Sequence, residues 1–203
     1  MSKKTSLPHL KLNAPGKGIV VTIDDGPIPE HCDNFLAACD AIELKTYCFV
    51  TGKALHDHPD LGKKLIDHGH VLCNHSYSHP HMTKLSAAEQ AEELDRCTEE
   101  ILKLTGAASP WFRFPYLDAD EALMDLVASR NMTSVGYAMY TKDPDLSSTP
   151  EQIIGRLDES FHRDGIVLGH HWSAATRAAL QVKVPQWRDA GCFGGLNLRI
   201  EGS

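Results

Sequence analysis

The sequence predicts a single α/β domain of parallel βαβ units, folded either as a barrel or as an open sheet. Short apolar runs alternate about seven times with longer helical patterns, which is typical of such units. The 203 residues, 42% of them hydrophobic, can bury one sizeable core but are few for two domains. Polar residues suited to chemistry also follow several expected strands, where α/β barrels build their active sites.

The expected strands are short runs rich in β-branched and other apolar residues, each ended by a turn signal or by the start of a helical pattern. The first run, GIVVTID, ends in Asp-Gly, and the third leads directly into a histidine-rich loop. In chain order the strands are expected at Gly18–Asp24, Thr46–Val50, Val71–Cys73, Trp111–Phe114, Thr133–Met139, Ile166–Gly169 and Gly194–Ile200.

Helices are expected between these strands. The segment Ser86-Ala-Ala-Glu89 has the capping-box pattern, and periodic apolar residues continue that helix to Gly106. The segment Thr149-Pro150-Glu151-Gln152 begins a later helix in the same way. The other helices are expected at about Glu30–Ile42, Lys53–His68, Ala119–Arg130 and Ala174–Leu180.

Composition and charge exclude some classes of partner. The formal charge of -7 argues against nucleic acid, because phosphate binding depends on clustered Lys and Arg. No stretch approaches the roughly 20 apolar residues of a membrane helix, and residues 1–15 lack the apolar centre of a signal peptide. The six cysteines form no C-x-x-C pair, which favours reduced and mostly buried thiols. We therefore expect neither a nucleic-acid nor a membrane partner, and a cytoplasmic chain unless a signal has been trimmed.

The candidate functional residues follow expected strands. Asp24 and Asp25 end the first strand, His75 follows the third, and Arg113 and His170 lie at the ends of two later ones. Because the carboxyl ends of parallel strands meet at one edge of the sheet, this placement supports an active site independently of any motif.

Each of these signals also has a purely structural interpretation. Adjacent carboxylates at Asp24 and Asp25 repel unless a cation or partner offsets them, but Asp-Gly after a strand is also ordinary turn chemistry. His75 and His79, four positions apart, can reach one zinc ion, yet histidine is frequent here, with 12 in the chain. Two histidines and one carboxylate would leave positions open for water and substrate, as a catalytic metal requires.

Three further candidates are ambiguous by themselves. Arg113 can be a surface residue ahead of a proline turn, and His170 a residue of the core or its rim. The segment Asp143-Pro-Asp145 has the composition of a solvated loop. These signals become strong if the fold brings them to one site.

Five short motifs, taken together and in this order, resemble those of the NodB-type polysaccharide deacetylases, family 4 of the carbohydrate esterases. They are TIDDGP (Thr22–Pro27), NHSYSHP (Asn74–Pro80), RFPY (Arg113–Tyr116), DPD (Asp143–Asp145) and IVLGHH (Ile166–His171). The resemblance spans about residues 18–172 and implies one catalytic deacetylase domain over residues 1–203. It also implies a distorted (β/α) barrel and one divalent metal, usually Zn²⁺ and sometimes Co²⁺ or Ni²⁺.

The resemblance assigns roles motif by motif. It implies that Asp25, His75 and His79 are the metal ligands, Asp24 the general base, Arg113 the residue that orients this base, the backbone N–H of Tyr116 the oxyanion donor and His170 the general acid.

Two departures from the family pattern leave details open. His171 stands where the family usually has Asp, and Asp145-Leu146 stands where the family usually has Asp-Trp. Either Asp143 or Asp145 is therefore expected to orient His170. The wall of the acetyl pocket is expected to include Leu146, Leu168 and Trp172.

The expected function is that of a metal-dependent hydrolase removing acetyl groups from N-acetylated sugars, such as N-acetylglucosamine oligo- or polysaccharides. An O-acetyl esterase acting on a decorated polysaccharide such as acetylxylan is the alternative, and a non-catalytic carbohydrate-binding member of the fold is a remote one. The motifs describe the acyl end of the substrate and leave the sugar, and any protein partner, undetermined.

Overall fold

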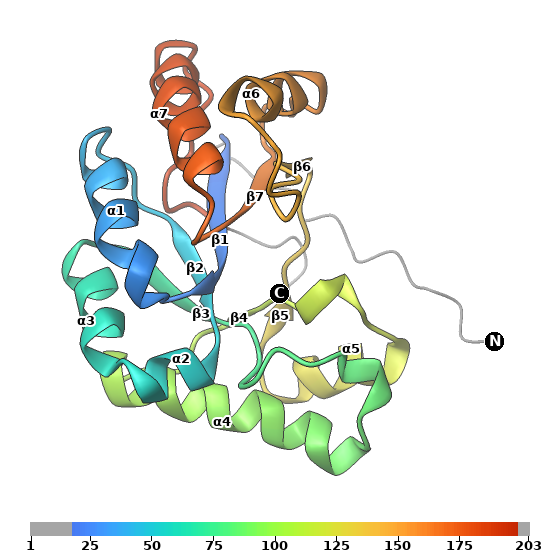
Figure 1. Cartoon of the computed structure of the whole chain (residues 1–203). Coiled ribbons are helices and arrows are strands. Elements are labelled where there is room, and N and C mark those ends of the chain that lie inside the picture. Colours follow the sequence, from blue (N-terminus) through green and yellow to red (C-terminus); the bar gives the residue numbers. More distant parts are fainter. Residues whose placement is uncertain (1–17, 199–203) are drawn as a thin grey trace.

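The computed structural model describes residues 18–198, in which parallel strands form one curled sheet flanked by helices (Figure 1). The strand order across the sheet is β5-β4-β3-β2-β1-β7-β6. The described strands are β1 (Val20–Gly26), β2 (Tyr47–Val50), β3 (Val71–Asn74), β4 (Trp111–Phe112), β5 (Thr133–Ser134), β6 (Met139–Tyr140) and β7 (Ile166–His170). The α-helices are α1 (Pro29–Asp40), α2 (Gly52–Asp57), α3 (Pro59–Asp67), α4 (Ala87–Thr105), α5 (Glu121–Ser129), α6 (Pro150–Glu159) and α7 (Ala174–Asp189).

The curl of the sheet follows from its connectivity. β5 and β6 lie at opposite edges, although Met139 follows Ser134 after only five residue steps. Five Cα–Cα steps reach at most about 19 Å. The edges of a flat sheet of this size would be about 29 Å apart. The two edges must therefore approach each other, which confirms the prediction of a distorted (β/α) barrel of about seven parallel strands.

The central strand β1 is buried on both faces. Val21 and Ile23 belong to the core between the sheet and the helices, whereas Val20 packs with residues on the other face. Successive residues of a strand alternate between faces, so Thr22 and Asp24 share the inner face with Val20. This alternation brings the polar end of β1 into the barrel.

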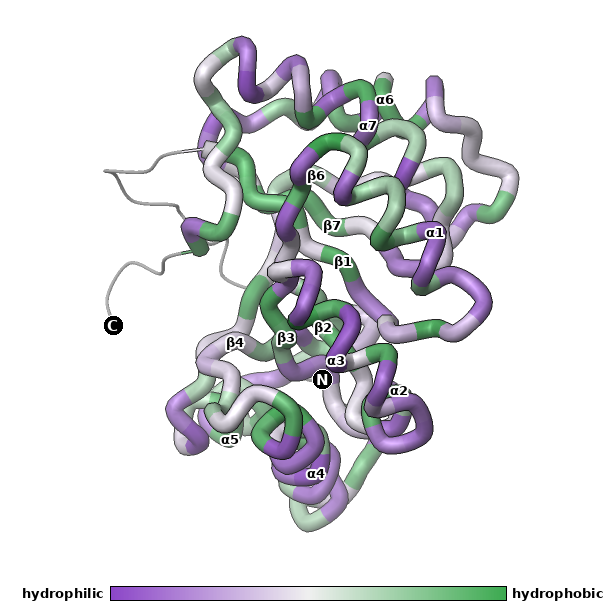
Figure 2. Tube along the Cα trace, turned by 90° about the vertical axis from the view of Figure 1, so that its left-hand side faces the viewer, coloured by the Kyte–Doolittle hydropathy of each residue, from purple (hydrophilic) through white to green (hydrophobic). Residues whose placement is uncertain are grey.

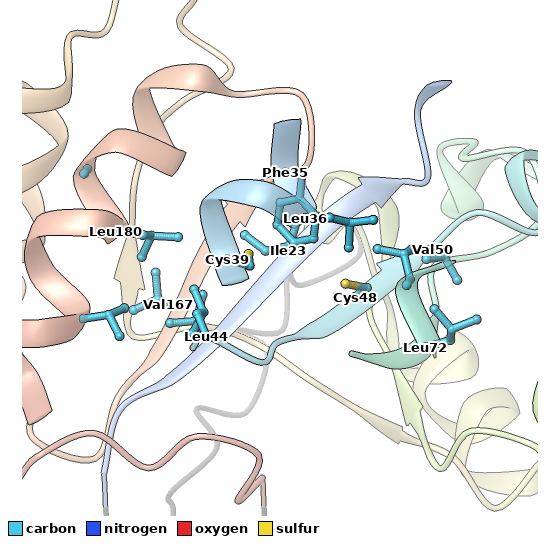
Figure 3. Close-up of a cluster of buried hydrophobic side chains, with 14 of the residues drawn as sticks. Ile23, Phe35, Leu36, Cys39, Leu44, Cys48, Val50, Leu72, Val167 and Leu180 are labelled. Atoms are coloured by element: carbon cyan, nitrogen blue, oxygen red, sulfur yellow. The ribbon is translucent and has the colours of Figure 1, made fainter. Parts of the chain in front are cut away.

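The main hydrophobic core lies between the sheet and the helices that cover it. Figure 3 shows Phe35 and Cys39 of α1 beside Ile23 of β1. The central strands β1 and β7 begin with hydrophobic residues and end with hydrophilic ones, while both kinds of residue occur along α4 (Figure 2). All six cysteines are buried and free, as predicted. Among the described helices, none combines the length and apolar character needed to cross a bilayer.

Two predicted elements are divided in the structure, and a third is absent over its described residues. The helix expected over Lys53–His68 is divided into α2 and α3, because Pro59 lacks an N–H and restricts the residue before it. The strand expected over Thr133–Met139 is divided between the two edge strands. The prediction of a strand at Gly194–Ile200 is wrong for residues 194–198, where the chain turns at Gly195 with a φ of 60°. Its last two residues lie outside the described range.

The last helix is longer than predicted. The pattern from Ala174 was expected to end near Leu180, but α7 continues to Asp189 with Pro185 inside it. Val184 and Trp187, on either side of this proline, are buried against the core. Tertiary packing therefore offsets the hydrogen bond that Pro185 cannot donate.

Buried His70 makes stability depend on pH. Its Nδ1 accepts hydrogen bonds from the N–H and hydroxyl of Thr46, and burial lowers the pKa of His70 to about 4. Because the pKa of His70 in the folded protein is below the unfolded value of about 6.5, neutral His70 contributes fully to the free energy of unfolding above about pH 6.5. This contribution is lost as the pH falls toward 4. The loss should approach about 3 kcal/mol.

Urea unfolding at several pH values tests this expectation against the variant His70→Asn, which keeps an acceptor near Thr46 but cannot ionise. The parent should lose more stability than the variant between pH 6.5 and 4. Parallel curves for the two proteins would show that His70 does not titrate in this range.

Candidate active site

β1 ends in two adjacent carboxylates that face the same cavity. In a regular strand, the side chains of Asp24 and Asp25 would point to opposite faces. The pairing of β1 with β2 shifts register between Asp24 and Gly26, so Asp25 is an extra residue in a bulge and has a φ of 70°. This bulge explains how both carboxylates line one cavity at the carboxyl edge of the sheet.

Arg113 follows β4, is completely buried and holds Asp24. Its Nη1 donates to Asp24 Oδ1 at 2.7 Å and to Thr22 Oγ1 at 2.8 Å. Its Nε and Nη2 donate to the carbonyls of Val135 and Gly136 at 3.1 and 2.9 Å. A buried guanidinium needs such partners, so the interpretation of Arg113 as a surface residue is wrong.

Asp25, His75 and His79 form one cluster of possible metal ligands. Their candidate ligand atoms all lie within 4.8 Å of one another. The Asp25 Oδ1 atom is 3.5 Å from His75 Nε2 and 3.3 Å from His79 Nε2. The Nδ1 of His75 donates to the Arg113 carbonyl at 2.8 Å, which leaves its Nε2 free to face the cluster.

The chemistry of this cluster fits a divalent cation. Two imidazoles and one carboxylate are the donors that catalytic zinc sites use, with positions left for water and substrate. The buried Oδ1 of Asp25 has no hydrogen-bond partner among the described residues, as a ligand atom would require. Burial by itself raises the pKa of Asp25, but His75, His170 and His79 hold it well below its ordinary value. Asp25 is therefore an anion at neutral pH.

His170, at the end of β7, is held by Asp143. The ring Nδ1 lies 2.6 Å from Asp143 Oδ1, and the backbone N–H of His170 donates to Asp143 Oδ2 at 2.9 Å. Thr176 donates its hydroxyl to the same carboxylate at 2.6 Å. Burial lowers the pKa of His170, but Asp143 and the nearby charges of Asp24 and Asp25 outweigh burial and raise it. These charges therefore favour the imidazolium form of His170 more than it is favoured in a free histidine.

The other candidate orienting residue, Asp145, lies outside the site. It is exposed and accepts hydrogen bonds from the backbone and hydroxyl of Ser147. Leu146 is 85% exposed and does not line the cavity, so the prediction that it forms a pocket wall is wrong. The turn from Asp145 to Ser148 directs these side chains into solvent.

The cavity has a volume of about 540 Å³ and brings the remaining candidates together. Arg113 and Asp143 lie behind it and hold Asp24 and His170, respectively. The His170 ring stacks on Trp172 at 5.4 Å. The lining residues are Asp24, Asp25, His75, His79, Phe114, Tyr116, Leu117, Tyr140, Pro144, Leu168, His170 and Trp172.

Strained backbone is concentrated at this cavity. Non-glycine residues with positive φ are uncommon, and each costs free energy that the surrounding structure must offset. The residues that line the cavity and have a positive φ are Asp25 (70°), His79 (61°), Tyr116 (55°) and Leu117 (54°). Such strain is typical of sites whose groups are held in place before a ligand binds.

Several lining residues were not predicted from the sequence. Tyr140 ends β6, and burial, together with the charges of Asp143 and the β1 carboxylates, raises its pKa to about 12. Its place at a strand end was a usable signal, but the predicted strand stopped at Met139. Phe114 and Leu117 flank Tyr116 in the third motif, and Pro144 lies between the two aspartates of the fourth.

Fold and site together define a (β/α)-barrel protein with a His/Asp cluster at the carboxyl ends of its strands. The family model described as polysaccharide deacetylase matches residues 11–135, and the chain belongs to this family. The predicted membership of the NodB-type deacetylases is thereby confirmed, and the matched residues contain the first three of the five motifs.

Individual relatives and structures agree with this assignment. A peptidoglycan-N-acetylglucosamine deacetylase from Bacillus cereus is 31% identical over 126 residues, which cover 62% of this chain and 46% of that protein. A family 4 carbohydrate esterase from Streptomyces lividans, solved in complex with acetate, superposes with a TM-score of 0.80 at 26% identity. The superposed region covers 90% of this chain and 93% of the esterase chain. The chain spans about half the length of the curated relatives it matches.

The fold also occurs in proteins without activity. BA3943, a CE4 family pseudoenzyme from Bacillus anthracis, superposes with a TM-score of 0.82 at 23% identity, covering 89% of this chain and 64% of that one. At this identity the likeness shows the shared fold alone. Function must therefore be argued from the residues of the cavity.

Proposed function

We propose that this protein is a metal-dependent hydrolase that removes acetyl groups from N-acetylglucosamine-containing oligo- or polysaccharides. The observation that supports this most directly is the convergence of three elements on one cavity: the Asp24–Arg113 pair, the His/Asp cluster and the Asp143–His170 pair. The Bacillus cereus relative, a peptidoglycan-N-acetylglucosamine deacetylase, favours an amino-sugar glycan as the substrate.

Asp25, His75 and His79 would hold one divalent cation, with Zn²⁺ the first choice and Co²⁺ or Ni²⁺ suited to the same donors. When bound, such an ion polarises the acetyl carbonyl and lowers the pKa of water. The roles of the other residues follow from their own contacts.

Asp24 is the proposed general base. Its Oδ1 is occupied by Arg113, whereas its Oδ2 faces the cluster, 3.8 Å from His75 Nε2. The free oxygen can accept a proton from a water molecule as that water attacks the acetyl carbon. Arg113 fixes the orientation of the Asp24 carboxylate and therefore of its free oxygen, because the guanidinium is itself held by the carbonyls of Val135 and Gly136.

His170 is the proposed general acid. Because Asp143 is bound to Nδ1, the proton on Nε2 is the one that faces the cavity, where Nε2 lies 3.9 Å from Asp25 Oδ2. An amide needs this proton more than an ester does, because an amine anion is a far poorer leaving group than an alkoxide. Tyr116 lies at the cavity wall, and its backbone N–H is the proposed donor to the tetrahedral oxyanion.

The mouth of the cavity suits a sugar chain rather than a small free amide. Tyr116 is 60% exposed, and its ring stacks on His81 at 4.1 Å. Trp172, stacked on His170, also lines the cavity. The exposed ring of Tyr116 and the partly buried ring of Trp172 offer apolar surfaces to the acetylated sugar and to its neighbours in a glycan chain.

Acetate release tests this proposal. The purified protein, loaded with Zn²⁺, should release acetate from N-acetylglucosamine oligomers and from peptidoglycan fragments, and a chelator should abolish the release. Acetate from acetylxylan but none from the amino-sugar substrates would replace the proposal with an O-acetyl esterase. Absence of release from every acetylated glycan, with metal bound, would favour a non-catalytic carbohydrate-binding protein.

A further inference from the structure

The segment from His75 to His79, here called the ligand loop, contains two of the three residues in the proposed metal cluster. It follows β3 and is neither helix nor strand. Ser76 and His79 have φ values of 66° and 61°, so the loop is in a conformation that it does not favour by itself. Contacts from outside must therefore hold it.

Four successive backbone N–H groups of the ligand loop donate to side-chain oxygens. These bonds run from Ser76 to Asn74 Oδ1 (2.9 Å), from Tyr77 and Ser78 to Glu93 Oε2 (2.9 and 2.8 Å) and from His79 to Ser76 Oγ (3.1 Å). The hydroxyl of Ser78 also donates to Glu93 Oε1, at 2.6 Å. One carboxylate therefore receives three bonds from the residues between the two histidines.

Glu93 lies on a helix that is itself well fixed. α4 begins with a complete capping box at Ser86 and ends at Gly106 in the left-handed conformation, and Leu94 next to Glu93 is fully buried. Hydrogen bonds to a charged acceptor are roughly twice as strong as neutral ones. Glu93 thus ties the loop to a rigid element.

The opposite side of the ligand loop is held by α2. The first two N–H groups of this helix, from Gly52 and Lys53, donate to the carbonyls of Ser76 and Tyr77 at 3.0 and 2.9 Å. The N–H groups of α2 thus bind the carbonyls of the loop, while the Glu93 carboxylate binds its N–H groups. Without Glu93, two N–H groups and one hydroxyl lose their acceptor, and the strained residues are free to relax.

We propose that Glu93 is a positioning residue for the metal site, which sets the relative placement of His75 and His79 through the backbone between them. The inference rests on the proposed metal cluster but does not require that the protein be a deacetylase. A divalent cation binds best to ligands that are already in place, so loss of Glu93 weakens binding although Glu93 touches no ligand atom.

Titration of the metal-free protein with Zn²⁺ against a chromophoric chelator tests the proposal. Glu93→Ala should raise the Kd for Zn²⁺ by about 10- to 100-fold. Glu93→Gln, which keeps a neutral acceptor, should give a smaller rise. Glu99→Ala, at an exposed position of the same helix, is the matched control and should leave the Kd unchanged. His79→Ala provides the reference for complete loss of a ligand.

Thermal unfolding of the metal-free variants separates positioning from stability. A purely structural role would lower the melting temperature of Glu93→Ala and leave its Kd at the parent value, which would overturn the proposal. If Glu93→Ala does not fold, the Kd of Glu93→Gln for Zn²⁺ tests the proposal instead. A Kd equal to that of the parent would overturn the proposal. A parent that binds no Zn²⁺ also refutes it. The titration needs no turnover, so a parent that binds Zn²⁺ without releasing acetate refutes only the proposed function.

Discussion

Asp24→Asn is expected to lower kcat on N-acetylglucosamine oligomers by about 10²- to 10⁴-fold while bound metal stays at the parent level. The amide cannot accept a proton from water, but its oxygen can still accept the hydrogen bond that Arg113 donates to Asp24 in the parent. Asp24 is also outside the cluster whose ligand atoms lie within 4.8 Å of one another. Steady-state kinetics and elemental analysis of the same preparation measure both quantities.

Asp25→Asn is the matched control because it makes the same chemical change at the neighbouring position. It should lose metal and activity together, since Asp25 supplies the carboxylate of the cluster. If Asp24→Asn loses its metal while Asp25→Asn retains it, the two roles proposed here are exchanged. Circular dichroism should confirm that both variants fold, because Asp24 pairs with a fully buried arginine.

His170→Ala is expected to separate two kinds of substrate. Hydrolysis of an N-acetyl group should fall by about 10²- to 10⁴-fold, because the departing nitrogen must be protonated. Hydrolysis of an activated aryl acetate should change little, because its leaving group needs no proton. Measuring kcat/KM for both substrates on parent and variant gives the ratio directly.

Asp143→Asn and Asp145→Asn are the companion variants. Asp143 is bonded to the imidazole of His170, whereas Asp145 is exposed and bonded to Ser147. The first substitution should therefore impair N-deacetylation in the same direction as His170→Ala, and the second should leave it near the parent value. An equal loss on both substrates in His170→Ala would show that His170 is not the acid.

The sequence alone determined the fold class and most of the candidate site. Alternating strand and helix patterns are local, and each is encoded by the residues of one segment. The placement of Asp25, His75 and His170 at strand ends is similarly local, and parallel strands bring such ends to one edge. The five motifs then connected these positions, and the barrel confirms that one cavity contains them.

The choice between Asp143 and Asp145 required the tertiary structure. Both are loop aspartates two positions apart, and no periodicity distinguishes them. The backbone turns at Lys142, with a φ of 53°, and β7 lies beside the loop so that the N–H of His170 reaches Asp143. The next turn, from Asp145 to Ser148, leaves Leu146 exposed to solvent.

The hydrogen bonds through which Arg113 and Glu93 hold the site residues could not be predicted from the sequence either, because they join segments that are distant along the chain. Arg113 donates to oxygens 91 and 22 positions away along the chain, and Glu93 accepts from residues 15 and 16 positions before it. Side-chain hydrogen bonds across such separations depend on how the sheet curls and where α4 packs. Local patterns specify which groups reach the edge of the sheet, whereas packing between distant segments specifies which of those groups hold one another in place.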